Sequence, residues 1–341
     1  MTGNRIPRAA PGRRAAPRLS AGAHRTSLPR YAARRLALGF AQVVAVTALV
    51  FALTEALPGD AAVVLAGDAP DPARIERIRE ELGLDRPAPA RYADWLLGLL
   101  HGDLGASLTA GRPVTGFLAD AAGPTVQLAA VTLLLLVPLA VAAGVVAALR
   151  EGRLLDRTLT AAGVALYSVP EFALAVVLVA LFALRLGWFP PTAVGVGTNL
   201  FAQPAVLVLP LLALLARPIC SISRLVRAGM VDALGSEYVR HARRLGLSGR
   251  RVTLAHALPN AVAPAAQQLA RTTDWLLGGV ITVEAVFVIP GLGTSLMSAV
   301  SARDIPVIQG LALVFAVTTV VVNLLADVVA FRLAPRAGGT A

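Results

Sequence analysis

The sequence lacks lysine altogether: its 31 basic side chains are all arginine, spread over 341 residues. A phosphate-binding loop of the P-loop type requires a lysine, so this chain cannot contain that kind of nucleotide site. The single cysteine, Cys220, excludes an intrachain disulfide and is expected to be a small buried residue. The four histidines are scattered, with no HExxH motif, so we predict no metal site and no catalytic centre.

Charged residues are also scarce, and apolar residues are abundant. Charged residues make up 15% of the chain and apolar residues 56%, and the mean hydropathy is +0.70. Six apolar stretches are long enough to cross a hydrocarbon core about 30 Å thick. They cover residues 36–57, 126–149, 159–184, 204–220, 265–289 and 305–331. We therefore predict an all-α polytopic membrane protein with six transmembrane helices, and we expect these helices to tolerate Pro138, Pro170 and Pro210.

The distribution of arginine predicts the orientation of these helices. Residues 1–35 contain nine arginines and no acid, and residues 217–256 contain eight arginines and two acids. In contrast, residues 58–126 contain six arginines and ten acids. Because basic segments stay in the cytoplasm, both termini and the basic segment are predicted to be cytoplasmic. The net charge of +11 then reflects topology and contacts with anionic lipids, and we expect no binding of nucleic acid.

The chain divides into five parts on this basis. Residues 1–35 are predicted to be a disordered basic cytoplasmic tail, and residues 36–57 the first transmembrane helix. A cleaved signal peptide is the alternative for this segment, but its apolar run is longer than usual for one, which favours a retained anchor. Residues 58–125 form an extracytoplasmic loop with short helices. Residues 126–334 form a five-helix core that includes a cytoplasmic loop at 232–260, and residues 335–341 form a cytoplasmic tail.

The cytoplasmic loop is the most informative segment that the sequence contains. It is rich in arginine and carries the break Gly246-Leu247-Ser248. Glycine can adopt the left-handed conformation that ends one helix, and Ser248 can cap the next, so we predict a hairpin of two short helices. A solvated loop that only obeys the charge rule is the alternative. That rule requires arginines but no Gly-Leu-Ser break, so a hairpin that docks on a partner is favoured.

The outer loop also carries helix signals. Residues 72–82 are amphipathic, Gly83 follows as a helix stop, and Asp85 with Pro87 marks a restart. Tyr92 and Trp95 are residue types typical of the membrane interface. A loop of this length with helices of its own usually binds a partner or has another function.

Several motifs occur together in one order. They are the LGLD-x-P to PV segment at 82–114, the Tyr238-Val239-Arg240, Gly246-Leu247-Ser248 and His256-Ala257-Leu258 groups, and Glu284, Pro290-Gly291-Leu292-Gly293 and Arg303-Asp304. In this order and spacing, the chain resembles the permease subunit of a binding-protein-dependent ABC importer. The resemblance is to the dipeptide, oligopeptide and nickel branch, and it covers residues 34–336.

The resemblance implies roles for particular residues. The residues expected to couple to an ATPase are Tyr238, Arg240, His241, Ala242, Gly246, Leu247, Ser248, His256, Leu258, Pro259 and Asn260. Those expected to dock an extracytoplasmic binding protein are Asp85, Trp95, Asp103, Arg303 and Asp304. The chain departs from the wider family at Arg240, where the coupling motif has glutamate, and at Ala334, where an acid is expected. It also departs at Arg271 and Asp274, where the family usually has apolar or small residues.

Charged residues inside the apolar stretches are candidates for the translocation path, because charge in lipid is costly. They are Glu171, Arg271, Asp274 and Glu284. Arg271 and Asp274 are three residues apart on one helical face, so a local ion pair near the cytoplasmic interface is an equal alternative for them.

The implied function is import of peptides by alternating access, in the plasma membrane of a bacterium. The implied partners are a second homologous permease, two ABC ATPase subunits that use ATP and Mg, an extracytoplasmic binding protein and membrane lipids. This chain would bind no cofactor and would not be an enzyme. Import of nickel or a metal chelate is the alternative within the branch. A secondary transporter is the alternative outside it, although we find no internal repeat.

Overall fold

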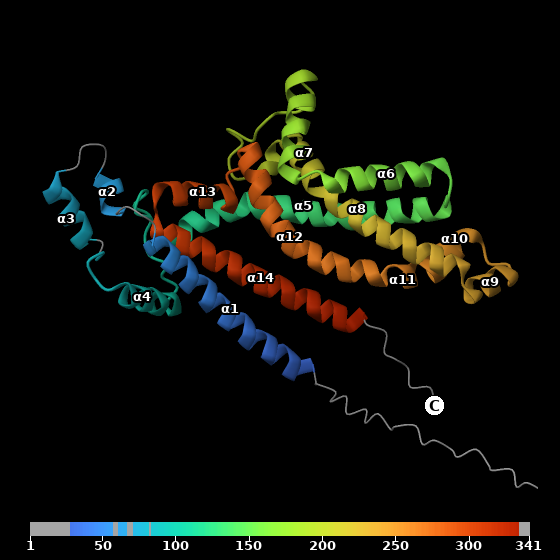
Figure 1. Cartoon of the computed structure of the whole chain (residues 1–341), viewed down its shortest axis with the longest axis horizontal. Helices are drawn as coiled ribbons and strands as arrows, with labels where there is room; N and C mark the ends of the chain where they lie inside the picture. The colour runs from blue at the N-terminus through green and yellow to red at the C-terminus, as the bar shows by residue number, and fades with distance from the viewer. Residues whose placement is uncertain (1–27, 57–60, 67–70, 82, 334–341) are drawn as a thin grey trace, which may run out of the picture.

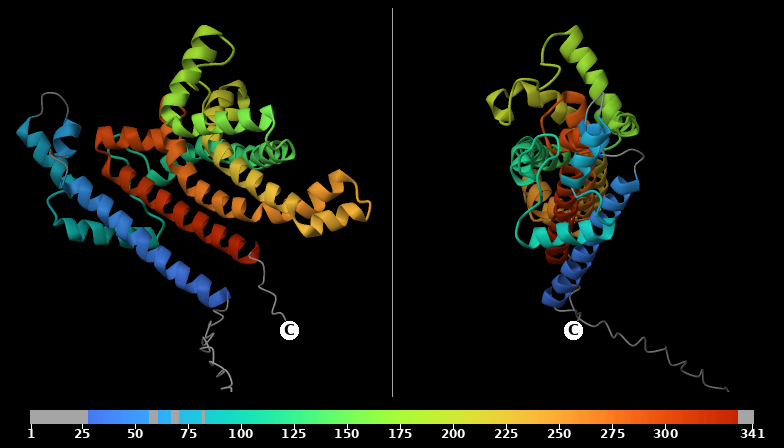
Figure 2. Two further views of the ribbon diagram at one scale, coloured as in Figure 1. Left: turned by 45° about the vertical axis from the view of Figure 1, so that its right-hand side comes forward. Right: turned by 90° about the vertical axis from the view of Figure 1, so that its left-hand side faces the viewer.

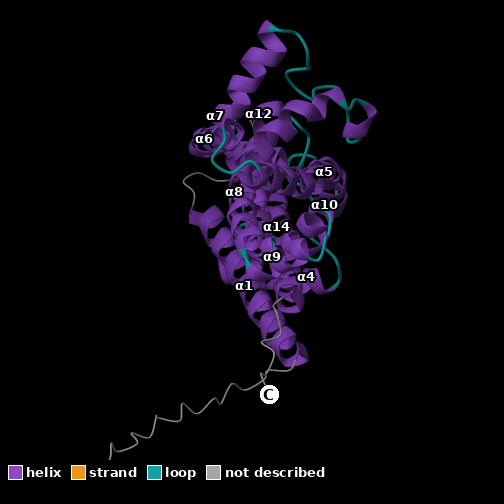
Figure 3. Cartoon of the chain, turned by 90° about the vertical axis from the view of Figure 1, so that its right-hand side faces the viewer, coloured by secondary structure: helices purple, strands orange, loops and turns teal. Residues whose placement is uncertain are grey.

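The computed structural model describes residues 28–56, 61–66, 71–81 and 83–333, and every regular element in these ranges is a helix. Four long helices contain segments that are long and apolar enough to cross a membrane. They are α1 (Leu28–Ala56), α5 (Val114–Leu149), α8 (Ala205–Gly235) and α14 (Ile305–Leu333). Figure 3 shows how little of the described chain lies outside helices, which confirms the all-α prediction.

Two further candidate spans are bent pairs of helices. Helix α6 (Leu154–Ser168) is followed, across a bend of 105°, by α7 (Glu171–Leu178) and the π-helix η1 (Val179–Arg185). The last part of α12 (Ala263–Phe287) meets α13 (Leu292–Ala302) with a bend of 77°. The described chain thus contains four candidate spans, or up to six if each bent pair is one span.

The prediction that Pro170 lies inside one continuous helix over 159–184 is wrong. Helix α6 ends at Ser168, and Val169 is extended, with φ −87° and ψ 126°. The cause is steric, because a proline ring disfavours the helical conformation of the residue before it. Pro138 and Pro210, in contrast, lie inside α5 and α8 without ending either helix.

Three helix boundaries differ from those predicted. Helix α1 begins at Leu28, so the last residues of the predicted disordered tail are helical. Helix α5 begins at Val114 and includes the end of the predicted outer loop. Helix α8 continues beyond Cys220 to Gly235, so several of the arginines counted as loop residues lie on it. Residues 1–27 and 334–341 of the predicted tails lie outside the described residues.

Helices α5 and α8 form the most extensive helix pair of the fold. Their backbones approach closely at Gly144, where an added Cβ would lie 2.6 Å from the carbonyl oxygen of Ser223. Small residues allow this kind of contact between membrane helices. A buried apolar cluster around Leu136, Val226 and Met230 then joins both helices to the segment that follows α8.

Two groups of short helices lie at opposite ends of the molecule (Figures 1 and 2). At one end lie α2 (Ala61–Ala66), α3 (Pro72–Glu81) and α4 (Ala88–Leu100). At the other lie α9 (Glu237–Arg244) and α10 (Gly249–Arg251), and the chain returns from them through the π-helix η3 (Val252–Ala257) and α11 (Leu258–Ala261). A short 3-10 helix, η2 (Leu200–Ala202), precedes α8.

Candidate functional site

The segment after α8 forms the predicted hairpin of short helices. Helix α9 ends at Arg244, and Gly246 has φ +80°, the left-handed conformation expected of it. The N–H of Gly246 donates to the carbonyl oxygen of Arg243 at 3.0 Å, and the N–H of Leu247 donates to that of Ala242 at 3.3 Å. These bonds close the end of α9 and turn the chain toward α10, which confirms the helix break that the sequence predicts.

The capping bond predicted for Ser248 is absent. Ser248 occupies the N-cap position of α10 with an extended backbone, φ −63° and ψ 146°, but its hydroxyl makes no capping hydrogen bond. The N–H of Val252 instead bonds to the backbone carbonyl of Ser248 at 3.0 Å. The backbone conformation at this position thus agrees with the prediction, whereas the side-chain role does not.

The inner face of the hairpin is anchored in the apolar core. Val239 and Ala242 of α9 are buried, as are Val252 and Ala257 of η3, and all four belong to the cluster that contains Met230 of α8. At about 25 cal/mol per Å² of buried apolar surface, such a face fixes the hairpin firmly to the membrane helices. A displacement of the hairpin is therefore expected to move α8 as well.

The outer face of the hairpin combines exposed apolar and basic side chains. Tyr238 is 44% exposed, Leu245 68% and Leu254 60%. Seven of the eleven residues predicted to couple to an ATPase are exposed, namely Tyr238, Arg240, His241, Gly246, Ser248, Pro259 and Asn260. Ala242 is buried, and Leu247, His256 and Leu258 are half-buried. Apolar centres with a polar rim are typical of protein interfaces.

Three polar contacts lie on this exposed face of the hairpin. The amide of Asn260 donates to the phenol oxygen of Tyr238 at 3.2 Å and to the carbonyl oxygen of His256 at 3.0 Å, so the two arms of the hairpin are joined. Arg240 pairs with Glu237 one turn earlier on α9. Both side chains of this pair are largely exposed, so the pair contributes little to stability and can separate when a partner binds.

Glu284 serves a different purpose near the end of α12 that lies far from the hairpin, where it is fully buried. Its carboxylate accepts hydrogen bonds from the Thr125 hydroxyl at 2.5 Å and from the Gly293 N–H at 2.7 Å. A Cβ on Gly291 or Gly293 would lie 2.2 Å or 2.8 Å from the nearest carboxylate oxygen, so only glycine fits at both positions. Glu284 thus caps the first turn of α13 and is enclosed by its own chain. Its role in a translocation path stays a prediction.

Asp304 is also buried, although it was predicted to dock a binding protein at the surface. Its carboxylate accepts hydrogen bonds from the Ser107 hydroxyl at 2.5 Å, from the Thr109 hydroxyl at 2.8 Å and from the backbone N–H of Leu108 at 3.1 Å. Asp304 therefore fastens the segment between α4 and α5 to the start of α14. In this arrangement its carboxylate is not available at the surface.

The other residues predicted to dock a binding protein lie closer to the surface. Asp85 and Asp103 are exposed, and Arg303 is half-buried. Trp95 is half-buried on α4, where its ring stacks on that of Tyr92 at a centroid distance of 6.0 Å. The Tyr92 hydroxyl in turn donates to the carbonyl oxygen of Val44 in α1, so these rings attach α4 to the first long helix.

The translocation-path candidates divide into two groups. Glu171 is half-buried at the start of α7, with a carboxylate oxygen 3.9 Å from a guanidinium nitrogen of Arg217 on α8. The side chains of Arg271 and Asp274 lie outside the described residues, although both positions belong to α12. Whether Arg271 and Asp274 line a translocation path or form a local ion pair therefore stays a prediction.

An ion pair that the sequence did not predict joins α6 to α8. Asp156 is buried and accepts a bidentate bond from Arg227, with nitrogen–oxygen distances of 2.5 Å and 2.7 Å, and a further bond from the Gly152 N–H at 2.9 Å. The two partners are 71 residues apart, so no local spacing could reveal the pair. It fixes the turn between α5 and α6 to the helix that leads into the hairpin.

The described residues contain no group of three or more His, Cys, Asp or Glu side chains that could hold a metal ion. Membrane-length helices with a partly apolar, basic hairpin at one end are compatible with a membrane transport subunit that docks on a partner. The sequence profile of the family described as "Binding-protein-dependent transport system inner membrane component" matches residues 140–339, and the profile of its amino-terminal part matches residues 28–129. The chain belongs to this family of inner-membrane permease components.

Curated relatives agree with that assignment. A Brucella abortus protein named as a peptide transport system permease is 35% identical over 300 residues, which cover 86% of this chain and 94% of the relative. A Sinorhizobium fredii protein named as a peptide ABC transporter permease is 34% identical over 309 residues, 90% of this chain and 98% of the relative. The glutathione transport system permease of Escherichia coli O6:H1 is 38% identical over 283 residues, 83% of this chain and 90% of the relative.

The chain is therefore a permease component of a peptide- or glutathione-type ABC importer, located in the bacterial inner membrane. The resemblance identified from its sequence motifs is confirmed.

Proposed function

We propose that this chain forms half of a peptide translocation pathway, together with a second homologous permease, and that its hairpin docks on an ABC ATPase subunit. The observation that carries the proposal is the two-sided hairpin. Its inner face is buried with α5 and α8, whereas its outer face exposes Tyr238, Leu245 and Leu254 among arginines. A hairpin with no partner would not be expected to expose large apolar residues at its tip.

In the same proposal the membrane is crossed six times and both termini are cytoplasmic. Each bent helix pair then counts as one span. Residues 1–35 and 335–341 are tails, 58–125 contribute the extracytoplasmic surface, and 126–334 form the core. This topology keeps the arginine-rich amino-terminal segment on the side of the hairpin, as the positive-inside rule requires.

The proposed mechanism is alternating access driven by the partners. ATP and Mg bind between two ATPase subunits, which close and move the hairpins. The buried face of each hairpin passes this movement to α8, and the Asp156–Arg227 pair passes it from α8 to α6. An extracytoplasmic binding protein delivers the substrate to the outer loops. This chain itself supplies no catalytic residue and binds no cofactor.

Peptides are the proposed substrates, since two of the three named relatives carry peptide transport in their names and glutathione is itself a tripeptide. Import of nickel or a metal chelate remains the alternative within the branch. The binding protein is expected to make most of the selection.

The test is purification of the tagged chain from its native membrane in mild detergent, followed by mass spectrometry of the proteins that accompany it. Recovery of a second permease and of P-loop ATPases supports the proposal. A Leu245→Asp variant should lose the ATPases and keep the second permease, whereas Arg112→Asp at the outer end should keep both. Folded wild-type protein that recovers no ATPase would refute the proposed coupling.

A further inference from the structure

We propose that α4 is an interfacial helix, which lies in the membrane leaflet opposite the hairpin and holds a lipid acyl chain in the groove between itself and α1. Under the proposed topology this is the outer leaflet. The contact with lipid follows from the position of α4 beside α1, so it goes beyond the proposed function and does not require the coupling of the hairpin to an ATPase.

Helix α4 lies alongside the first long helix and not beyond its end. The segment of α1 that is long and apolar enough to cross a membrane is Ala33–Ala56. The Tyr92 hydroxyl of α4 donates to the carbonyl oxygen of Val44 at 3.1 Å, and the centre of the Tyr92 ring is 5.3 Å from that of Phe51. Val44 precedes Ala56 by 12 residues, which corresponds to about 18 Å along the helix. Helix α4 is thus placed beside the half of this apolar segment that is far from the hairpin, at the depth of a leaflet.

The charged side chains of α4 lie together on one side of it. Arg91 pairs with Glu55 of α1 at a nitrogen–oxygen distance of 2.5 Å, and Asp94 pairs with Arg86 at 2.6 Å. Arg91 and Asp94 are three residues apart, so they project from the same side of the helix. A side that carries two ion pairs belongs at the level of water or lipid headgroups, because charges are costly in hydrocarbon.

Another side of α4 is apolar and is not covered by the described chain. Leu97 is 58% exposed and Leu100 79%, and Ala93 is exposed as well. The three positions are spaced i, i+4 and i+7, which places them on one face of the helix. No residue of α4 is buried. A helix with one charged side and one apolar side is typical of those that lie at the membrane surface with the apolar side among the lipid chains.

A groove between α1 and α4 connects two exposed apolar surfaces. Its volume is about 380 Å³, and the side chains that line it are Phe51, Ala52, Glu55 and Ala56 of α1 and Ala88, Pro89 and Tyr92 of α4. On α4, Pro89 lies one turn before the exposed Ala93. On α1, Ala52 lies one turn after Leu49, which is 60% exposed. An acyl chain fits such a groove, because it buries apolar surface and needs no hydrogen bond.

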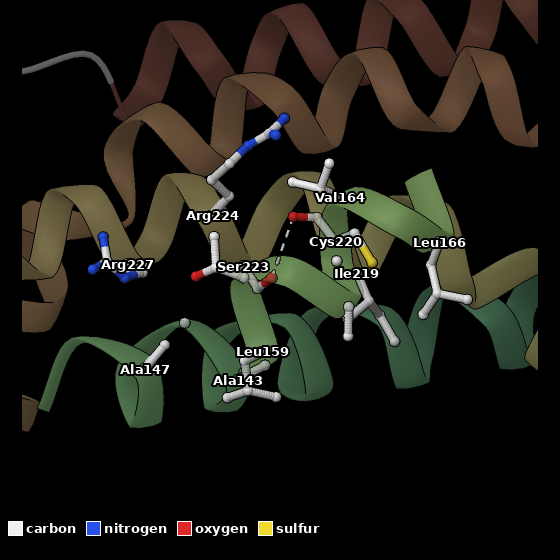
Figure 4. A pocket seen from close by; sticks show the side chains of 14 residues that line it. Ala143, Ala147, Leu159, Val164, Leu166, Ile219, Cys220, Ser223, Arg224 and Arg227 are labelled. Atoms are coloured by element: carbon white, nitrogen blue, oxygen red, sulfur yellow. Dashed lines mark hydrogen bonds between the residues drawn. The ribbon is translucent and has the colours of Figure 1, made fainter. Parts of the chain in front are cut away.

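Lipid accounts for this surface better than a second protein does. Helix contacts within this chain use small residues, as at Gly39 of α1, where an added Cβ would meet the Val320 side chain of α14. Ala143 and Ala147 likewise line the cavity of about 180 Å³ where α5 meets α6 and α8, as Figure 4 shows. Small residues are typical of such contacts, whereas the uncovered side of α4 carries leucines. Helix α4 also lies on the side of α1 opposite to α14, in Figure 1 and in the left view of Figure 2, so lipid can reach it.

The experiment uses the tagged chain in liposomes, together with the subunits that accompany it from its native membrane. Benzoylphenylalanine replaces Leu97 or Leu100 on the apolar side of α4, Asp94 on its charged side, or Leu49 on α1. The liposomes contain phospholipid with a radiolabelled oleoyl chain. After illumination, labelling from positions 97 and 100 should be within about twofold of that from 49 and about fivefold or more above that from 94, because acyl chains reach only the apolar side.

A phospholipid with a photoreactive diazirine on its acyl chain tests the groove. It should modify the residues that line the groove, and Ala52→Phe, which fills the groove, should lower this modification about threefold or more. Modification that Ala52→Phe leaves unchanged would overturn the assignment of the acyl chain. Labelling from position 97 no higher than that from 94, or an adduct with the second permease or the binding protein at 97 in place of lipid, would overturn the whole inference. Absence of an ATPase from the purified complex would refute the proposed coupling and leave this labelling pattern intact.

Discussion

The two ends of this permease use polar side chains in opposite ways. At the end far from the hairpin, Glu284 and Asp304 are buried and their carboxylates are occupied by hydroxyl and N–H groups of the same chain. In the hairpin, polar side chains such as Arg240 and His241 are exposed, and most of the buried side chains belong to the apolar inner face. These two buried acids therefore stabilise the fold, and the hairpin surface remains available to a partner. Loss of either acid should lower stability, whereas loss of a hairpin side chain should lower partner binding.

The largest effect on stability is expected at Glu284. Glu284→Ala removes the acceptor for the Thr125 hydroxyl and the Gly293 N–H, both in a buried place. Leaving such groups unsatisfied should cost about 3 kcal/mol, visible as a lower Tm of the protein in detergent. Glu284→Gln, which keeps an acceptor, should lose less. Asp120→Ala, which removes the exposed partner of Arg112, is the control, and a Tm loss as large as that of Glu284→Ala would contradict this assignment.

Asp304→Ala should have the next largest effect. The variant frees the hydroxyls of Ser107 and Thr109 and the N–H of Leu108, and the expected loss is about 2 kcal/mol. Hydrogen exchange is expected to accelerate at residues 107–109 while α9 remains protected. Asp103→Ala removes an exposed carboxylate from the same region and serves for comparison. Unchanged exchange at 107–109 in the Asp304 variant would show that this carboxylate does not hold the loop.

The hairpin offers a matched pair of glycines with a smaller expected effect. An added Cβ at Gly246 or Gly249 meets nothing within 4 Å, but only Gly246 has a positive φ. Gly246→Ala should therefore cost about 1 kcal/mol through the backbone alone. Gly249→Ala should be neutral or slightly stabilising. Equal stability of the two variants would mean that the left-handed conformation at residue 246 is not required.

Arg240→Ala should have the smallest effect on stability, since its pair with Glu237 is exposed on both sides. Binding of the ATPase should nevertheless weaken, mostly through slower association at low salt, because exposed charges steer encounter. The association and dissociation rates can be measured by titrating immobilised permease with purified ATPase at two salt concentrations. Faster dissociation with unchanged association would instead indicate that Arg240 is buried in the interface.

The local features of this fold could be predicted from the sequence, and the long-range ones could not. The break at Gly246 depends on one residue's φ, and the helix stop at Gly83, where φ is +62°, depends on another. The helix break at Pro170 could not be predicted, because some membrane helices continue through a proline and others end there. The packing of neighbouring helices decides between the two outcomes. The hydrogen bond between Thr125 and Glu284 joins residues 159 positions apart, so no local pattern could predict it.

The same limit explains the residues that the sequence analysis missed. Arg217 falls within the predicted apolar stretch at 204–220 and was counted only as part of a basic region. Its position inside a span was the one available signal. Its contact with Tyr167 requires α6 to pack along α8, and Asp156–Arg227 requires the same packing. Apolar periodicity predicts that helices form, but it does not tell which of their faces meet.

Photo-crosslinking from the hairpin tip tests the central claim most directly. A photoreactive residue would replace Leu245 at the tip or, as the matched position, Arg112 at the outer end, in membranes that contain the whole importer. We predict an ATPase adduct from position 245 that increases or decreases when ATP is added, and none from position 112. An intact complex that yields no ATPase adduct at 245, or equal adducts at both positions, would contradict the assignment of the hairpin as the coupling site.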